Sequence, residues 1–450
     1  MRFLADVEQP TAAVVGLGYV GSCVAGALAD RGVHVIGIDN DATRVAEFAA
    51  GHVRVNEPGL SELMTRWLGG PRLQVTDDYR AAAEADVVLV VVGTPARDDG
   101  SLADEQLVDA CRELGQHLRH GQLVIAKSTV SPGTTRNLVV PLLENGGLRC
   151  GEDFGVAFSP ERLSEGSALH ELATFPIVVG GVCPDSSRAA QDFWQRGLGV
   201  DVRAVESVEA AEIVKLVNNW WIDHNIALAN EVGKFCAAFE VDSLQVISAA
   251  NTIHRGNGPV NVLLPSVGVG GSCLTKDPWM VWRAAQDRDV GLRTVTTARE
   301  VNDSMPHYTA EMVLDDLRNR DREPEKSAVA VLGLAYKNNT GDLRETPTLP
   351  MVELLRRAGV VVTVHDPLAD PDEIASKFDT TPCASAYDAV AGVDCIAVLA
   401  WHQVMIELDF GELGRAANEE CLLLDGRAYF NGDTIADLEN CGFRYRGVGR

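Results

Sequence analysis

A glycine motif lies near the start of the chain, between a short apolar run and a helical stretch. Gly16, Gly18 and Gly21 form G-x-G-x-x-G directly after the apolar residues 12–15. In such a motif the first glycine permits a tight turn, the second lets the backbone approach a pyrophosphate, and the third lets helix and strand pack closely. The helix that follows offers the positive end of its dipole to phosphates. The motif predicts a dinucleotide site, although glycines also serve purely structural turns.

An acidic residue stands where such a site needs one. Asp39 ends the next apolar run, 18 residues after Gly21. A carboxylate at that place accepts hydrogen bonds from the adenosine ribose and disfavours a 2′-phosphate. The sequence therefore predicts NAD as the cofactor, in preference to NADP.

Apolar runs and helical stretches alternate along the first third of the chain, which is typical of a parallel sheet covered by helices. Strands are predicted at 12–15, 33–38, 87–92 and 123–127, with a helix at 21–31. Residues 207–250 carry apolar side chains at helical spacing and predict one long helix or two in sequence. The polar stretch 318–326 contains Pro324 and is the predicted linker.

The opening pattern returns after this linker. AVAVLGLAYK at 328–337 resembles AAVVGLGYVG at 12–21, and GVDCIAVLAW at 392–401 resembles EADVVLVVVGT at 84–94. The sequence thus predicts an α/β protein with two doubly wound, Rossmann-like parallel-sheet domains joined by a long central helical segment. The predicted domains are the NAD-binding domain at 1–204, the central helical domain at 205–317 and the second sheet domain at 325–450.

Composition excludes several classes of protein. The 450 residues include 64 acidic and 39 basic side chains, for a net charge of −25, so no broad basic field would attract nucleic acid. The first residues lack the apolar stretch and cleavage site of a signal peptide, so we expect none there, and no apolar run is long enough to span a bilayer. The ten cysteines form no C-x-x-C pairs, which predicts free thiols in a reducing cytoplasm and no metal site.

One cysteine has unusual neighbours. Gly268, Gly270 and Gly271 come just before Cys273, and Lys276 and Asp277 follow within one turn. A glycine-rich loop allows backbone to approach a ligand and can present a nucleophile, although most cysteines are small buried apolar side chains.

The predicted central helix carries a polar stripe. Lys215 and Asn219 are spaced i, i+4 and share one face, and Asp223 continues it. Such a stripe is either a solvated surface or the wall of an active site. Asparagine is a poor helix former, so the asparagines of this helix, among them Asn219, Asn225 and Asn230, favour the wall of an active site.

Six segments together resemble the UDP-glucose/GDP-mannose dehydrogenase family and cover nearly the whole chain. They are GLGYVG at 16–21, KSTVSPGTT at 127–135, SPERLSEGSA at 159–168, KLVNNWWIDHNIALANE at 215–231, GVGGSCLTKDP at 268–278 and GLAYKNNTGDLRETP at 333–347. The resemblance implies an oxidoreductase of the EC 1.1.1 type that oxidises C6 of a nucleotide sugar twice, using two NAD and one water.

The resemblance also implies roles for single residues. Cys273 attacks the intermediate aldehyde, and its thiolate would be favoured by Lys276 or Lys215. Lys215 and Asn219 stabilise the oxyanion. Asp277 acts as a base or orients water, while Thr129 and Glu161 hold that water.

Binding residues follow in the same way. The implied contacts to NAD come from Gly16, Gly18, Tyr19, Val20, Gly21, Asp39, Arg44, Thr94, Ser128, Thr129, Glu165 and Lys276. The implied contacts to the UDP-sugar, for which the third domain is the main binding domain, come from Glu161, Arg162, Leu163, Lys215, Asn219, Arg255, Asn261, Gly270, Lys337, Arg344 and Arg427. An ordinary exposed arginine is the alternative interpretation of Arg344 and Arg427.

The sequence mixes two branches of the family. ALANE in the helix, AYK and DPW resemble the UDP-N-acetylhexosamine branch, whereas Ser272, Lys276 and 340–342 resemble the UDP-glucose branch. An arginine that relatives place before the glycine loop is replaced by 258–261, Gly-Pro-Val-Asn, and Arg255 is the candidate substitute. We expect a UDP-N-acetylhexosamine such as UDP-GlcNAc or UDP-ManNAc, with UDP-glucose as the alternative.

Two other functions compete at this point. One is a two-electron NAD-dependent hydroxyacid dehydrogenase, and the other is a non-catalytic nucleotide-sugar sensor. Neither needs a nucleophilic cysteine, so the set Cys273, Lys215 and Asp277 argues against both. The long apolar helix with Trp220 and Trp221 predicts a homodimer formed through it, with a higher assembly left open.

Overall fold

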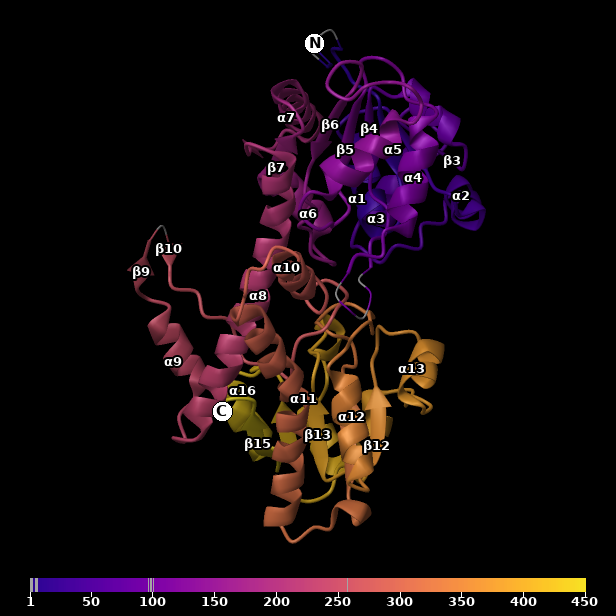
Figure 1. The fold of residues 1–450 in the computed structure, drawn as a ribbon. Helices are drawn as coiled ribbons and strands as arrows, with labels where there is room; N and C mark the ends of the chain where they lie inside the picture. Colours follow the sequence, from indigo (N-terminus) through magenta and orange to yellow (C-terminus); the bar gives the residue numbers. More distant parts are fainter. Residues whose placement is uncertain (1–2, 5–6, 96, 98, 100, 257) are drawn as a thin grey trace. The chain divides into compact units, whose positions relative to one another are not determined.

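The computed structural model describes residues 3–4, 7–95, 97, 99, 101–256 and 258–450 (Figure 1). It consists of two units, Met1–Asn218 with Arg283–Asp289 and Asn219–Trp282 with Val290–Arg450. Helix α8, Val208–Ala237, contains the point at which the chain passes from the first unit to the second. Among the described helices, none combines the length and the apolar content needed to cross a bilayer.

The first unit is built on an eight-stranded sheet in the order β3-β2-β1-β4-β5-β6-β7-β8. Its first six strands have the order of a dinucleotide-binding sheet and run parallel, while β7 pairs with β6 in the antiparallel direction. The strands are β1 Ala12–Val15, β2 Val35–Ile38, β3 Leu73–Thr76, β4 Val87–Val90, β5 Leu123–Ala126, β6 Gly155–Phe158, β7 Ile177–Gly181 and β8 Val202–Ala204.

Helices cover both faces of this sheet because its central strands are apolar on both sides. In β1, Ala12 and Val14 belong to a core with α1 and α7, whereas Ala13 and Val15 belong to a separate core with α4. The helices are α1 Tyr19–Asp30, α2 Ala42–Ala49, α3 Leu60–Trp67, η1 Tyr79–Glu84, α4 Glu105–Gly115, η2 Thr135–Val139, α5 Val140–Glu144, α6 Ala168–Thr174 and α7 Pro184–Leu198.

The second unit contains a five-stranded, fully parallel sheet in the order β12-β11-β13-β14-β15, another doubly wound order. Its strands are β11 Ala328–Leu332, β12 Val361–His365, β13 Cys395–Val398, β14 Leu422–Asp425 and β15 Arg444–Gly447, and a short hairpin pairs β9 His254–Arg255 with β10 Gly258–Pro259. The helices are α9 Ser243–Ala250, α10 Asp277–Gln286, which extends into the first unit, α11 Thr294–Asn319, η3 Pro324–Lys326, α12 Thr348–Arg357, α13 Pro371–Phe378, α14 Ala386–Ala389, η4 Gln403–Met405, α15 Phe410–Ala416 and α16 Gly432–Asn440.

The predicted fold class is confirmed, with two Rossmann-like sheets and a long helix between them in the sequence. Residues 207–250 form two helices, α8 and α9, which was one of the two predicted outcomes. The antiparallel pairing of β7 was not foreseen, because an apolar strand pattern carries no information on strand direction.

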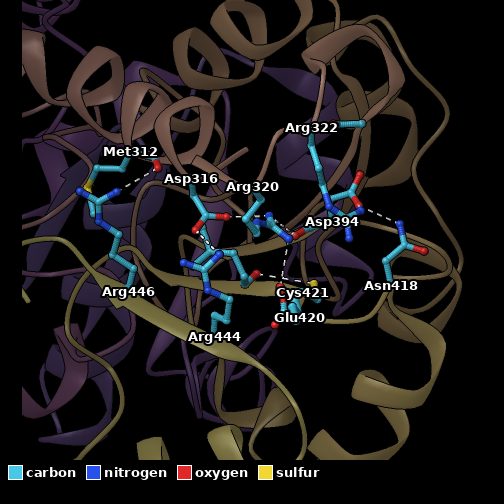
Figure 2. A network of polar contacts seen from close by, with 12 residues as sticks. Met312, Asp316, Arg320, Arg322, Asp394, Asn418, Glu420, Cys421, Arg444 and Arg446 are labelled. Atoms are coloured by element: carbon cyan, nitrogen blue, oxygen red, sulfur yellow. Dashed lines mark hydrogen bonds and ion pairs between the residues drawn. The ribbon is translucent and has the colours of Figure 1, made fainter. Parts of the chain in front are cut away.

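The polar stretch predicted as a linker is fixed to the second sheet by a network of ion pairs (Figure 2). Arg320 contacts Asp316 at 2.6 Å and donates to the carbonyl of Asp394 at 3.2 Å. Arg322 pairs with the carboxylate of Asp394, and Arg444 contacts Asp316 at 3.0 Å. Asp394 immediately precedes β13, so this network fastens the end of α11 to the amino-terminal edge of the sheet.

Candidate active site

The three glycines of the motif meet three different local requirements. Gly16 has φ +94° and a Cβ there would lie 2.7 Å from the carbonyl oxygen of Val91, while a Cβ on Gly21 would lie 1.8 Å from the carbonyl oxygen of Gly16. At Gly18 an added Cβ would meet nothing within 4 Å. The backbone at the start of α1 is therefore open to a ligand at the position where a pyrophosphate would approach.

Asp39 lies at the carboxyl end of β2 beside this loop, and it is buried. Its carboxylate accepts hydrogen bonds from the amide of Leu17 at 2.6 Å, the amide of Asp41 at 3.0 Å and the guanidinium of Arg44 at 3.0 Å. A carboxylate offers about four acceptor positions, so one remains for a ribose hydroxyl. Together with the open backbone at Gly18, Asp39 fits the dinucleotide predicted from the sequence.

The side chain of Tyr19 has a partner that the sequence did not suggest. Its hydroxyl donates to the buried carboxylate of Glu57, which also accepts from the amides of Gly166 at 2.7 Å and Leu169 at 3.3 Å. Burial, and then the bond to Glu57, raise the pKa of Tyr19. Glu57 thus ties the start of α1 to the loop that contains Glu165.

Three hydroxyl side chains predicted near the cofactor follow strands β4 and β5. The hydroxyl of Thr94 donates to the carbonyl of Thr129 at 2.7 Å, and that of Ser128 donates to the carbonyl of Val92 at 2.7 Å. These two bonds hold the ends of neighbouring strands together. They place Thr94, Ser128 and Thr129 at the carboxyl edge of the sheet, where ligands bind in such folds.

The loop after β6 brings two predicted catalytic residues together. Glu161 accepts from the amide of Leu163, and its carboxylate lies 3.9 Å from the ammonium of Lys215, which is buried. Arg162 donates to the carbonyl of Pro176, and burial lowers the pKa of its guanidinium. Glu161 and Lys215 therefore form an ion pair within the first unit.

A second buried lysine in this region gives the protein a pH-dependent stability. Burial lowers the pKa of Lys127 to about 8, although Glu161 opposes this shift. The ammonium donates to the carbonyl of Ser159 at 3.3 Å and lies 5.1 Å from the ring centroid of Trp194. Because the folded-state pKa is lower than that of the unfolded chain, the unfolded chain binds more protons between pH 8 and 10.5, and stability rises with pH in that window.

We expect the free energy of unfolding of the wild type to rise by about 2 kcal/mol relative to that of Lys127→Met between pH 8 and pH 10, since each pKa unit is worth about 1.4 kcal/mol. Below pH 8 the penalty for the buried ammonium is present in full. Chemical denaturation of both proteins at the two pH values measures the difference. Parallel pH profiles for the two proteins would contradict a lowered pKa.

In the second unit, Cys273 differs from every other cysteine. All ten cysteines lie in the described part of the chain, and Cys273 alone is exposed. Burial raises the pKa of Cys111 and of Cys421 to about 12, which keeps those two thiols protonated and inert. Cys273 is thus more open to solvent than the other nine cysteines.

The glycines before Cys273 allow close packing against a later segment of the chain. A Cβ on Gly270 would lie 2.5 Å from the carbonyl oxygen of Glu345 and 2.6 Å from the Cβ of Tyr336. A Cβ on Gly271, which has φ +82°, would lie 2.8 Å from the ring of Tyr336. Residues 268–273, here called the cysteine loop, therefore pack directly against residues 336–347. That segment contains Lys337 and Arg344.

Asp277 is fully buried at the start of α10 and joins two other predicted site residues. Its Oδ2 accepts from the amide nitrogen of Asn219 at 2.5 Å, and its Oδ1 pairs with the ammonium of Lys276 at 2.7 Å. Its backbone amide donates to the carbonyl of Cys273 at 2.9 Å. Asn219, Lys276 and Asp277 therefore form one cluster at the end of the cysteine loop.

The asparagines of α8 do not all line a ligand site. Asn225 accepts from the amide of Leu263 at 2.8 Å, and Asn230 accepts from the amide of Ser266 at 2.8 Å and donates to Asn302. These side chains bind the segment that leads into the cysteine loop, in place of the predicted wall. Asp223, on the same helix, pairs with the buried guanidinium of Arg299 at 2.6 Å.

The remaining predicted substrate contacts lie in several segments of the second unit. Arg344 pairs with Asp342, and the amide of Arg427 donates to Asp425 at 3.1 Å. Asn261 is exposed and its carbonyl accepts from Asn225. Arg255 belongs to strand β9, and its side chain lies outside the described part of the structure.

Comparison with known proteins covers the whole of this architecture. Residues 11–197, 209–304 and 330–432 match the NAD binding, central and UDP binding domains of the UDP-glucose/GDP-mannose dehydrogenase family. The chain is 32% identical over 440 residues to a UDP-N-acetyl-D-mannosamine dehydrogenase of Pyrococcus horikoshii, an alignment that covers 97% of this chain and 99% of the relative.

Two solved structures are similar over nearly their full length. A UDP-D-ManNAc dehydrogenase from Pyrococcus horikoshii has a TM-score of 0.85 at 30% identity, with coverage of 98% of this chain and 99% of that one. A UDP-glucose dehydrogenase from Pyrobaculum islandicum has a TM-score of 0.85 at 29% identity, with coverage of 99% of both chains. With all three domains present in order, the chain belongs to the UDP-glucose/GDP-mannose dehydrogenase family.

Proposed function

We propose that this NAD-dependent UDP-sugar dehydrogenase oxidises the C6 hydroxymethyl group of a UDP-N-acetylhexosamine to the carboxylate. The observation that carries the proposal is the presentation of Cys273, the exposed cysteine, on a loop that ends in the cluster of Asn219, Lys276 and Asp277. In the overall reaction one alcohol, two NAD⁺ and one water give one carboxylate, two NADH and three protons.

The covalent steps take place on the sulfur of Cys273. Bound NAD would supply the acceptor for the hydride that leaves C6 in each oxidation. The thiolate adds to the aldehyde carbon to form a thiohemiacetal, whose oxidation leaves a thioester. Water then attacks the thioester carbon, the C–S bond breaks, and the carboxylate leaves while the thiol is restored.

The neighbouring side chains are assigned to charge and proton handling. Lys215 and Asn219, one helical turn apart on α8, stabilise the oxygen at C6 as it gains negative charge. Asp277 accepts the proton of the alcohol or orients the water, and its burial beside Lys276 keeps it in place. Glu161 and Thr129 hold the hydrolytic water. Asp39 and the backbone at Gly18 bind the adenosine ribose and pyrophosphate.

The UDP-sugar is bound mainly by cations of the second sheet domain. Lys337, Arg344 and Arg427 are assigned to the diphosphate and sugar, which suits a protein whose net charge is −25. A few cations at defined places are sufficient for a dianionic ligand, so the acidic surplus does not oppose binding.

The choice of sugar rests on both residues and relatives. The sequence features ALANE, AYK and DPW resemble the N-acetylhexosamine branch, and the Pyrococcus relative is a UDP-N-acetyl-D-mannosamine dehydrogenase. UDP-glucose is the second candidate, because Ser272, Lys276 and 340–342 resemble that branch and the Pyrobaculum neighbour is a UDP-glucose dehydrogenase.

A substrate panel tests this proposal. NADH formation is followed with UDP-GlcNAc, UDP-ManNAc, UDP-GalNAc, UDP-glucose and GDP-mannose at equal concentrations. We expect the highest kcat/KM with one of the three UDP-N-acetylhexosamines. A higher value with UDP-glucose would favour the second candidate, and no NADH with any of the five would contradict the function.

We also propose that the protein is a homodimer formed through α8 and α9. On α8, Trp221, Leu228 and Phe235 recur at helical spacing and are 44–66% exposed, and the ring of Phe235 lies 5.0 Å from that of Phe239, which follows the helix. An apolar stripe of this length on one helix is typical of a protein interface. Sedimentation equilibrium of the full chain should give a dimer mass, and a monomer at micromolar concentration would contradict the proposal.

A further inference from the structure

The second sheet carries an aspartate at the position that corresponds to Asp39 of the first. Asp366 follows β12 and accepts hydrogen bonds from the amides of Leu334 at 2.7 Å, Ala335 at 3.1 Å, Leu368 at 2.9 Å and Ala369 at 3.0 Å. Together with a bond from His402 these fill the acceptor positions of the carboxylate. Asp366 therefore has none left for a ribose, unlike Asp39, and it serves to hold this edge of the sheet.

His402 is fully buried, and its two ring nitrogens have different partners. Its Nε2 lies 3.1 Å from Oδ2 of Asp366, and its Nδ1 lies 2.9 Å from the backbone nitrogen of Asn339. A backbone N–H can only donate, so Nδ1 is the acceptor and the proton of the neutral ring is on Nε2. Burial on its own raises the pKa of Asp366, but the hydrogen bonds from His402 and from the backbone amides outweigh burial and lower it to about 2.

Residues 338–339 are held to residues 401–403 by two further hydrogen bonds. The amide of Trp401 donates to Oδ1 of Asn338 at 3.0 Å, and the amide of Gln403 donates to Oδ1 of Asn339 at 2.7 Å. His402 joins the two segments more firmly, because it links the backbone of Asn339 to the ionised Asp366. The residue that precedes Asn338 is Lys337, the cation assigned above to the UDP-sugar.

We propose that His402 is a positioning residue, which fixes the backbone of the Lys337 loop through Nδ1 and so maintains affinity for the UDP-sugar. The effect on affinity for the UDP-sugar rests on the proposed function. The fixing of residues 337–339 by His402 concerns the geometry alone and can be measured without substrate.

Two substitutions separate the two sides of the imidazole. In His402→Asn the amide oxygen stands where Nδ1 was and can accept from Asn339, but the side chain is too short to reach Asp366. In His402→Gln the amide nitrogen can reach Asp366, but no acceptor faces Asn339. The backbone amide of Asn339 then loses its acceptor, and the loop is released.

The expected result is that His402→Gln raises the KM for the UDP-sugar roughly three- to tenfold, because the N–H of Asn339 loses its acceptor. The KM for NAD and kcat stay within about twofold, and His402→Asn keeps the KM for the UDP-sugar close to that of the wild type. Hydrogen exchange of the amides at 336–342 in the full chain without substrate should be faster for His402→Gln and unchanged for His402→Asn. Thermal melting confirms that both variants are folded.

Each outcome decides one part of the inference. Equal exchange at 336–342 in wild type and His402→Gln would overturn the positioning role. Faster exchange with an unchanged KM for the UDP-sugar would overturn its link to substrate binding. If the wild type oxidises no UDP-sugar, the proposed function fails, while the exchange measurement still decides whether His402 holds the loop.

Discussion

Replacement of Cys273 by serine is expected to lower the rate of carboxylate formation by on the order of 10⁶-fold, the scale of loss seen when the nucleophile of a serine protease is removed. A serine hydroxyl ionises far less readily than a thiol, so it does not form the covalent adduct with the aldehyde at neutral pH. Without that adduct no thioester forms, and the water has no acyl group to attack. Quantification of the UDP-uronate by mass spectrometry measures the effect.

The matched control is Cys441→Ser, which changes a half-buried thiol at the end of α16. It should leave carboxylate formation within about twofold of the wild-type rate, because Cys441 has no assigned role.

The exposure of Cys273 also predicts that brief alkylation of the folded protein modifies Cys273 before the other cysteines. Carboxylate formation by Cys273→Ser at more than a tenth of the wild-type rate would remove the cysteine from the mechanism.

Replacement of Asp277 by asparagine is expected to lower kcat by about 10²- to 10⁴-fold, which is the usual contribution of a general acid or base. Both carboxylate oxygens have donors opposite them, Asn219 at 2.5 Å and Lys276 at 2.7 Å. An amide has only one acceptor oxygen, so one of these partners would face an N–H group. The substitution therefore removes the base and also disturbs the cation beside it.

The control for this experiment is Asp287→Asn, which removes an exposed carboxylate just beyond the same helix. It should change neither kcat nor KM, because an exposed ion pair contributes little. Steady-state rates at several pH values, together with melting temperatures, separate a catalytic effect from loss of folding. A kcat for Asp277→Asn within threefold of the wild type would contradict the assignment.

Local patterns were sufficient to predict the two sheets and the glycine loop. Each feature of the first nucleotide-binding pattern lies within about 25 residues of the next, so it can be recognised locally. These features are the apolar run at 12–15, the spacing of Gly16, Gly18 and Gly21, and the acid at Asp39. The repeat of that pattern after residue 327 was visible for the same reason. The antiparallel direction of β7 beside β6 was not predictable, because the direction of a strand depends on how the chain returns to the sheet and not on its own residues.

The residues that sequence reasoning missed act across long separations. Glu57 accepts from Gly166, which is 109 residues away, and His402 reaches Asp366 and Asn339 across 36 and 63 residues. Neither residue lies in a segment that carries the resemblance, and a single acid or histidine in a loop has no distinctive local pattern. The close packing of the glycines before Cys273 was not predictable for a related reason, since their neighbours Tyr336 and Glu345 come from a later part of the chain.

The positions of the few lysines in the sequence indicated where the site residues lie. The chain has seven lysines among its 39 basic residues, and four of them, Lys127, Lys215, Lys276 and Lys337, fall in the segments that resemble the family. The structure buries two of these, Lys127 and Lys215, and pairs Lys276 with the buried Asp277. A compact ammonium suits such confined places better than a planar guanidinium.

The number of NADH molecules formed per UDP-sugar consumed distinguishes a four-electron from a two-electron oxidation. The reaction is run to completion with limiting UDP-N-acetylhexosamine and excess NAD, and NADH is measured by absorbance while the sugar products are measured by chromatography. A four-electron oxidation through Cys273 predicts two NADH per sugar, with the uronate as the product. A ratio of one, with the aldehyde as the product, would contradict it.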